Sequence, residues 1–259
     1  MTPTLPSMNV LRKLSQKKYR DREGLYLVEG ASALRDAILS EQPPVLLLYE
    51  DRANDREAEN HLLTLAFEHK IPVRELSDGE LVRISGLKTT PPVAGVFALP
   101  EAHDPVGPGP GEVVLALDRV MDPGNLGTLI RTALFYGVHD IWLGEGTADP
   151  FNPKVVRASM GAQLHARLCR NVKLEHVLTA EVQRGTRVLA TDLDGNNRFA
   201  PVTSDAPPAI LLLGNEPAGV APGLITVASE HVAIKRRGPV DSLNVAMAGA
   251  ILLDRLLAR

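Results

Sequence analysis

Five short apolar segments in the second part of the chain constrain its fold more than any other feature. None of them alternates between apolar and polar residues, and helix-length stretches separate most of them. The segments are Val113–Leu117, Ile141–Leu143, Val188–Ala190, Ile210–Leu213 and Val232–Ile234. Strands that are apolar on both sides must be buried on both faces, which is typical of a parallel sheet covered by helices. The sequence therefore predicts an α/β fold whose ligands bind beyond the carboxyl ends of the strands.

A stretch rich in proline and glycine, from Pro100 to Gly111, divides the chain. Such a composition supports neither a helix nor a central strand, so it predicts a linker. We expect an N-terminal domain over residues 1–102 and a larger domain over residues 103–259. Apolar patterns in the first domain predict a small α/β unit with helix Ala31–Leu39, strand Val45–Tyr49, helix His61–His69 and strand Val93–Leu99.

The composition narrows the class of protein. The chain has 259 residues, of which 44% are hydrophobic, and this is enough to fill a core. Its single cysteine, Cys169, excludes an internal disulfide framework and a cysteine-only zinc site, and we expect no metal. The segment Met1–Val10 lacks an apolar signal core, and no apolar run reaches the ~20 residues that span a bilayer. We expect a cytoplasmic protein without a membrane partner.

Positive charge gathers at two places in a chain whose net charge is -3. Six basic residues crowd one N-terminal stretch, and three follow one another near the other end. They are Arg12, Lys13, Lys17, Lys18, Arg20 and Arg22, and then Lys235, Arg236 and Arg237. Basic patches on an otherwise acidic protein can bind phosphate groups. The alternative is that both clusters are solvated charge runs.

The first loop to inspect covers Asp118–Thr128, directly after the first of the apolar segments. It leads into a predicted helix that ends near Gly137, a suitable residue just beyond a helix C-terminus. Between Asn125 and Val138 this helix carries a single charged residue, Arg131. A guanidinium in an apolar helix is costly unless it meets a carboxylate, a phosphate or a cleft. Arg131 is therefore either a member of a buried ion pair or an arginine that faces an anion at the sheet edge.

The second loop covers Gly214–Val220 and follows the fourth apolar segment. Gly214 and Gly219 permit unusual backbone angles and the close approach of a ligand, while Asn215 and Glu216 supply polar groups. A dinucleotide fingerprint of the form G-x-G-x-x-G is absent, as is a phosphate-binding P-loop. This absence disfavours a nucleotide-dependent oxidoreductase.

The third loop covers Arg236–Asn244 and precedes a long final helix. Ser242 is predicted to be the N-cap of that helix. From Leu243 to Leu253 the helix has no charge, and Asn244 is its only strongly polar side chain. A helix that is apolar nearly all round must be buried on several sides, so it needs a central position or a partner subunit. Capping explains Ser242 but gives no role to Asn244.

In this order, the three loops closely resemble the three motifs of the SpoU branch of the SPOUT superfamily, the RNA ribose 2′-O-methyltransferases. The residues that carry the resemblance are Asp122–Gly127 with Arg131, Leu213–Glu216, and Ser242–Val245. Asn152–Pro153 and Arg157–Ala162 also look like sequence of this family, and the resemblance spans Val113 to the carboxyl terminus. Leu11–Leu14 and Glu23–Gly30 more loosely resemble the family's substrate-binding domain, which has a ribosomal-protein-like fold.

The resemblance implies a parallel sheet whose carboxyl-terminal segment threads a loop to form a deep trefoil knot, which general chain rules would not predict. It implies S-adenosylmethionine as cofactor, bent and held by backbone groups of the second and third loops, and a homodimer with active sites at the subunit interface. The cofactor-binding residues would be Leu213, Gly214, Asn215, Glu216, Gly219, Ile234, Arg236, Ser242, Leu243 and Asn244. The catalytic residues would be Asn125, Arg131, Glu216, Ser242 and Asn244. RNA would be bound by Arg12, Lys13, Lys17, Lys18, Arg20 and Arg22.

Two positions depart from the family pattern. Pro217 stands where members often have glycine after the Asn–Glu pair, and proline removes one backbone donor and fixes φ. Ile234-Lys235-Arg236 stands where the family usually has Ile-Pro-Met. Both departures bear on the expected contacts with the cofactor, but neither removes a candidate polar residue.

The implied activity is methylation of a ribose 2′-hydroxyl in structured RNA. The full N-terminal domain looks more like the ribosomal-RNA enzymes of the family than its compact transfer-RNA enzymes. We therefore favour large-subunit ribosomal RNA over transfer RNA, and we expect no DNA partner. The family's arginine at the Arg131 position is proposed to activate the hydroxyl. A guanidinium is a poor base because it holds its proton very tightly, and clamping a phosphate is the alternative role.

Two other activities stay open at this point. One is methylation of a transfer-RNA ribose or of a base nitrogen by an enzyme of the same superfamily. The other is RNA binding without catalysis on the same fold, which the retention of every candidate polar residue disfavours.

Overall fold

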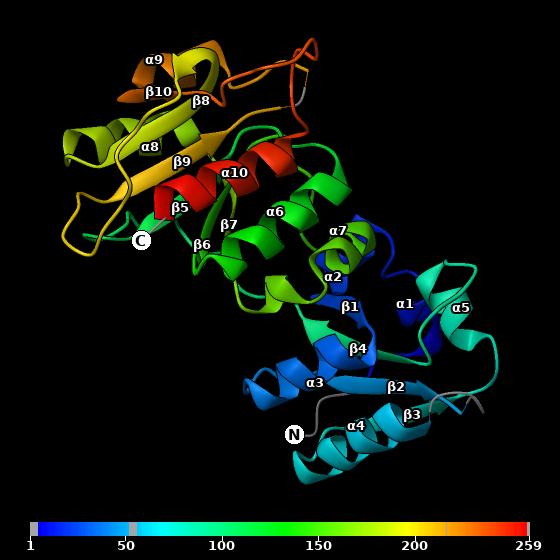
Figure 1. The fold of residues 1–259 in the computed structure, drawn as a ribbon. Helices are drawn as coiled ribbons and strands as arrows, with labels where there is room; N and C mark the ends of the chain where they lie inside the picture. The colour runs from blue at the N-terminus through cyan, green and yellow to red at the C-terminus, as the bar shows by residue number, and fades with distance from the viewer. Residues whose placement is uncertain (1–4, 52–55, 216, 258–259) are drawn as a thin grey trace. The chain divides into compact units, whose positions relative to one another are not determined.

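The computed structural model describes residues 5–51, 56–215 and 217–257 of the chain (Figure 1). Contacts between residues divide the chain into two compact units. Unit 1 comprises Met1–Glu101 with Phe151–Leu164, and unit 2 comprises Ala102–Pro150 with His165–Arg259. Each unit has its own sheet and its own hydrophobic core, so each is described by itself.

Unit 1 contains a four-stranded sheet in the order β1-β4-β2-β3. Strand β4 runs antiparallel to both of its neighbours, and β2 pairs in parallel with β3. The strands are β1 (Leu25–Glu29), β2 (Leu46–Glu50), β3 (Val73–Leu76) and β4 (Val93–Ala98). The helices before residue 101 are α1 (Met8–Leu11), α2 (Lys17–Glu23), α3 (Ala31–Leu39), α4 (Arg56–Glu68) and α5 (Glu80–Ser85). The predicted helix over α3 is confirmed, and the predicted strands lie within a residue of β2 and β4.

A short excursion from the second part of the chain packs into unit 1. It contains α7 (Pro153–Ser159) and a 3-10 helix, η1 (Ala162–Leu164). Arg157 Nη1 donates to Glu29 Oε2 at 3.0 Å, and the rings of Phe151 and Tyr26 lie 4.8 Å apart. The prediction assigned these residues to the domain 103–259. The composition of a linker indicates a boundary between domains. It does not indicate that a later segment, here Phe151–Leu164, packs with the first unit.

Unit 2 contains a six-stranded, wholly parallel sheet in the order β10-β8-β9-β5-β6-β7. Its strands are β5 (Val113–Leu117), β6 (Asp140–Gly144), β7 (Arg167–Val172), β8 (Arg187–Asn196), β9 (Ala209–Leu213) and β10 (Glu230–Val232). Its helices are α6 (Pro123–Phe135), α8 (Leu174–Gln183), α9 (Pro222–Val227) and α10 (Val245–Leu257). The parallel sheet predicted from the apolar segments is confirmed.

Alternate residues of the central strands serve two different helical layers. Ile210 and Leu212 of β9 pack in one core with Leu178 of α8 and Leu224 of α9. Leu213 faces the other layer, where a Cβ on Gly249 of α10 would lie 2.9 Å from its Cδ1. Helices α6 and α10 lie side by side on that second face (Figure 1). Helices on both faces explain why the central strands are apolar throughout.

Gly249 sets how closely α6 and α10 approach each other. A Cβ at this position would lie 2.5 Å from Leu129 Cδ2 of α6, closer than real Cβ contacts come. The absence of a side chain therefore allows α10 to pack tightly on α6 and β9. Among the described residues, no helix is long and apolar enough to cross a membrane.

Candidate functional site

The first loop is organised by the cap of helix α6. Asp122 Oδ1 accepts a hydrogen bond from the backbone amide of Asn125 at 2.8 Å, and Pro123 occupies the first helical turn. An aspartate cap followed by proline is a strong start signal for a helix, because proline has no amide to leave unpaired there. The Asp-Pro pair of the first motif thus fixes where α6 begins, just beyond the carboxyl end of β5.

A hydrogen bond between two asparagines joins the first loop to the third. Asn244 Nδ2 donates to Asn125 Oδ1 at 2.8 Å, across 119 positions of sequence. Asn244 Oδ1 also accepts from the backbone amides of Ala246 at 2.9 Å and Met247 at 3.3 Å. Asn244 is therefore both the N-cap of α10 and the link to the first motif.

The prediction that Ser242 caps the final helix is wrong. Helix α10 begins at Val245, so Ser242 lies two residues before the capping position, and its side chain is exposed. The sequence pattern placed the helix start near Leu243 because Leu243 is the first apolar residue of the run. A cap side chain must reach the amides two or three residues ahead, and here the asparagine does so.

The second loop is tightly closed on itself. The backbone of Asn215 exchanges hydrogen bonds with the backbone of Gly219, at 3.1 and 2.8 Å. The Asn215 side chain is 5% exposed; its Nδ2 donates to the carbonyl of Arg119 at 2.9 Å and its Oδ1 accepts from the Ala218 amide at 3.2 Å. Both polar groups of Asn215 thus shape the loop, which makes this residue a support for the site.

Gly214 is required by the close return of this loop. A Cβ on Gly214 would lie 2.2 Å from the carbonyl carbon of Gly219 and from the amide of Val220. Gly219 has φ of +65°, a conformation that glycine adopts most easily. Both glycines predicted from the second motif therefore have a steric reason to be glycine.

Two residues at the end of β5, neither of which was predicted to have a role, hold the second loop in place. Asp118 is 5% exposed and accepts both arms of the Arg119 guanidinium, Nε at 3.0 Å and Nη2 at 2.9 Å. Asp118 Oδ2 also accepts the Ala221 amide at 2.8 Å. The hydrogen bonds that Arg119 donates to Asp118 raise the pKa of Arg119 above its ordinary value, so this arginine stays charged. The available signal was a carboxylate directly after an apolar strand.

Arg119 adopts a left-handed backbone conformation, with φ of +53°. This conformation costs a side-chain-bearing residue ~1–2 kcal/mol, and the ion pair with Asp118 offsets that cost. Strain of this kind gathers near functional sites. Its effect here is to aim the Arg119 carbonyl at the Asn215 amide.

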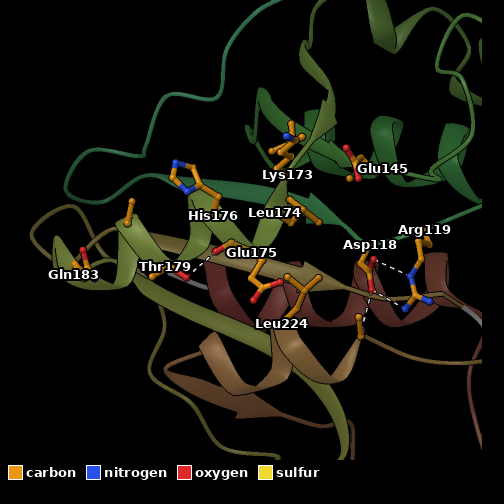
Figure 2. Close-up of a pocket in the computed structure, with 14 residues that line it drawn as sticks. Asp118, Arg119, Glu145, Lys173, Leu174, Glu175, His176, Thr179, Gln183 and Leu224 are labelled. Carbon is orange, nitrogen blue, oxygen red and sulfur yellow. Dashed lines mark hydrogen bonds and ion pairs between the residues drawn. The ribbon is translucent and has the colours of Figure 1, made fainter.

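A cavity of about 910 Å³ opens beside the Asp118–Arg119 pair (Figure 2). It follows the carboxyl ends of β5, β6 and β7, with Asp118 and Arg119 at one end and Gln183 of α8 at the other (Figure 2). Its charged lining includes Glu145, Lys173 and Glu175. None of the residues predicted for catalysis or cofactor binding lines this cavity, although Asp118 and Arg119 connect it to the second loop.

The remaining predicted residues of unit 2 have very different surroundings. Arg131 is exposed, so the alternative of a buried ion pair does not describe it. Leu213 is buried, Ile234 is half-buried and Leu243 is exposed. Arg236 Nη1 pairs with Asp241 Oδ1 at 2.7 Å. Glu216 lies outside the described residues.

The backbone of residues 234–243, which include the third loop up to Leu243, makes no hydrogen bond within the described chain. The segment begins just after β10 and ends at Asn244. The backbone amides and carbonyls of such a loop can bond to solvent or to a bound ligand.

The N-terminal basic cluster contains one residue that cannot contact a phosphate. Arg20 is 2% exposed, and its Nη1 donates to the carbonyls of Leu14 and Ser15, each at 2.9 Å. Its prediction as an RNA-binding residue is corrected here, because the guanidinium holds the turn between α1 and α2. The other five members, Arg12, Lys13, Lys17, Lys18 and Arg22, are exposed.

Metal-ligating side chains do not cluster among the described residues, and Cys169 lies in the core. No group of three or more metal-ligating side chains occurs among the residues that the structure describes. Cys169 is buried, and burial raises the pKa of its thiol to about 11. The thiol stays protonated near neutral pH, which suits a small residue of the core.

Comparison with known proteins identifies both parts of the chain. Residues 112–254 match the SpoU rRNA Methylase family, and residues 6–95 match the MRM3-like substrate binding domain. The chain belongs to the SpoU rRNA methylase family. A Bacillus subtilis relative, the 23S rRNA (guanosine(2553)-2′-O)-methyltransferase RlmP, is 31% identical over 95% of this chain and 93% of its own length.

Solved structures of SpoU and TrmH proteins have the same fold as this chain. A TrmH-family protein from Porphyromonas gingivalis superimposes with a TM-score of 0.82, at 34% identity and over 98% of both chains. An rRNA methyltransferase from Sinorhizobium meliloti, solved with bound AdoMet, gives a TM-score of 0.81 at 31% identity, over 98% of this chain and 95% of that one.

Proposed function

We propose that this SpoU family member transfers a methyl group from S-adenosylmethionine to a ribose 2′-hydroxyl of large-subunit ribosomal RNA. The observation that carries the proposal is the bond between Asn125 and Asn244. It brings the first and third motifs together at the carboxyl edge of the sheet, where parallel α/β folds bind ligands. The 23S rRNA activity in the name of the Bacillus subtilis relative supports the choice of RNA.

The second and third loops fit the cofactor. The second loop is preformed, because its chain returns closely past Gly214 and is hydrogen-bonded through Asn215. The third loop offers backbone donors and acceptors over residues 234–243 that no other described residue uses. Such groups suit an adenine edge and the polar ends of a bound methionine, and the AdoMet-bound structure from Sinorhizobium meliloti supports this choice. When bound, S-adenosylmethionine supplies an electrophilic methyl group.

The residues of this chain contribute mainly by positioning. The ribose oxygen must approach the methyl carbon in line and lose its proton, so correct orientation supplies much of the rate. Asn125 and Asn244 hold each other in a fixed geometry beside the ribose. Arg131 acts as a cation that clamps a phosphate or orients the hydroxyl, because its planar guanidinium suits both tasks better than proton abstraction. We include Glu216 of the second loop and Ser242 of the third loop in the catalytic set because both are polar residues of the proposed site.

We propose that the enzyme works as a homodimer through α6 and α10. Phe135 of α6 and Met247 of α10 are 82% and 53% exposed, and Leu243, just before α10, is 51% exposed. Large apolar side chains on one pair of helices are typical of an interface between copies. A Phe135→Asp variant should be monomeric by light scattering. Phe67→Asp, at an equally exposed phenylalanine of α4, should leave the dimer intact.

We further propose that the chain segment after β10 threads a loop of unit 2 to form a trefoil knot. Family membership and the placement of α10 against α6 and β9 support this topology. The proposed division assigns RNA capture to residues 1–102 and methyl transfer to residues 103–259. A ribosomal RNA substrate would place the enzyme in the cytoplasm.

Mass spectrometry of nucleosides tests the proposed reaction. The purified protein is incubated with S-adenosylmethionine carrying a deuterated methyl group and with an unmodified 23S rRNA transcript. We expect a labelled 2′-O-methylnucleoside. A labelled base would reassign the reaction to base methylation, and label only in transfer RNA would change the substrate. Tight RNA binding without any label would favour the non-catalytic alternative.

A further inference from the structure

The basic residues Lys235, Arg236 and Arg237 differ in how they are engaged. All three are exposed in the loop that leaves β10. Arg236 pairs with Asp241, whose side chain is 92% exposed. Lys235 and Arg237 make no hydrogen bond or ion pair with any other described residue. Two cations in this loop are therefore available to an anion from outside the chain.

Their position in the fold places them at the edge that carries the proposed site. Strand β10 ends at Val232, and all strands of this sheet are parallel, so the loop leaves from the same edge as the loops after β5 and β9. The loop then returns to Asn244, which bonds to Asn125. Lys235 and Arg237 thus lie in a short loop that runs from the end of β10 to the Asn125–Asn244 pair.

The other basic cluster offers a contrast in charge balance. In the N-terminal stretch, Lys17 pairs with Asp21 and Arg22 pairs with Glu23. Within the loop sequence 234–243, the one carboxylate is Asp241, and it pairs with Arg236. Uncompensated charge at a site edge attracts polyanions more strongly than paired charge does.

We propose that Lys235 and Arg237 bind backbone phosphates of the RNA strand that flank the nucleotide to be methylated. The inference rests on the proposed function and assigns the substrate contact on the catalytic side of the chain. Two separate cations match a chain of phosphates, each with its own charge. Arg236 is the positioning member, because its pair with Asp241 holds the loop that presents the other two.

The anion could instead be the carboxylate of the cofactor, and binding measurements separate the two sources. In the Lys235→Gln/Arg237→Gln variant, binding of a single-stranded oligouridine should depend less steeply on salt. The logarithmic slope should fall by about 1.4, that is ~0.7 for each lost phosphate contact. The affinity for S-adenosylmethionine, measured by calorimetry without RNA, should stay within about twofold. Under turnover, KM for the rRNA transcript should rise while kcat is retained.

A matched variant controls for overall charge. Arg184→Gln/Arg255→Gln removes the same charge from exposed positions of unit 2 and should leave the salt slope unchanged. Lys235→Arg/Arg237→Lys should restore the slope, because phosphate binding needs the charge at these positions. An unchanged slope in the first variant, or an equal loss in the control, would overturn the proposal. A loss of cofactor affinity with an intact slope would assign the two cations to the cofactor. These binding results need no turnover, so they stand even if no ribose methylation is found.

Discussion

The second and third loops of unit 2 leave the same edge of one sheet but are built in opposite ways. In the second loop, the polar groups of Asn215 are already hydrogen-bonded within the chain, to Gly219, Ala218 and Arg119. The third loop makes no backbone hydrogen bond over residues 234–243 within the described chain. We interpret the difference as a division of roles, in which the second loop is preformed and the backbone of the third loop is available to the proposed cofactor.

The largest effect should come from adding a methyl group at Gly214 of the second loop. Gly214→Ala puts a Cβ 2.2 Å from the backbone of Gly219 and Val220, so the loop must open. We expect unit 2 to lose about 3 kcal/mol of stability, at the upper end of overpacking costs, together with cofactor binding. Gly238→Ala in the third loop meets nothing within 4 Å and should change stability by less than about 0.5 kcal/mol. Thermal unfolding that is equal for the two variants would erase the contrast.

Removal of Arg131 should affect activity far more than stability. Its side chain is exposed on α6, so Arg131→Ala should lower the melting temperature very little. Methyl transfer should fall by at least ~100-fold, as expected when a positioned catalytic group is lost. Arg131→Lys keeps the charge without the planar fork and should recover little activity. Near-normal turnover by a folded Arg131→Ala enzyme would remove this residue from the site, and Arg255→Ala on α10 serves as the control.

The same contrast shows what the sequence could predict. Strands of the sheet interior were found because both of their faces are apolar. Strands β3 and β7 were not predicted. Each is the last strand of its sheet, and polar residues such as Arg74 and Arg170 interrupt its apolar run. The three candidate loops came from motif residues at strand ends, and the family comparison agrees with that interpretation.

Roles within the site were harder to predict than its location. Asn244 was expected to serve only the active site, and Ser242 was expected to cap the helix as well as serve the site, yet the asparagine caps α10. Arg20 was grouped with its basic neighbours, although it is buried against carbonyl groups. A local pattern cannot separate these cases, because burial and hydrogen-bond partners depend on residues distant in sequence.

Three substitutions at the start of α10 separate capping from the link between loops. Asn244→Ala should cost about 1 kcal/mol of stability through the lost cap. Asn244→Asp keeps the acceptor for the Ala246 amide but loses the donor to Asn125, so stability should be retained while methyl transfer falls. Ser242→Ala should leave stability unchanged. Chemical denaturation checks the first and third expectations, and a destabilised Ser242→Ala variant would restore the serine as the cap.

The smallest effect concerns Arg119, the residue with a strained backbone that supports the second loop. Arg119→Ala and Arg119→Gly both lose the ion pair with Asp118, but glycine accepts the left-handed backbone at φ of +53°. The glycine variant should therefore be about 1 kcal/mol more stable than the alanine variant. Equal stability in denaturant titrations would mean that the backbone relaxes once the ion pair is gone.

Hydrogen–deuterium exchange with and without S-adenosylmethionine tests the division between the two loops most directly. Without cofactor, the amides of residues 234–243 should exchange rapidly, because none of them is bonded within the described chain. The Asn215 and Gly219 amides should already be protected. Saturating cofactor should slow exchange across residues 234–243 and leave Asn215 and Gly219 almost unchanged. Cofactor binding that leaves the third loop in rapid exchange would contradict the account.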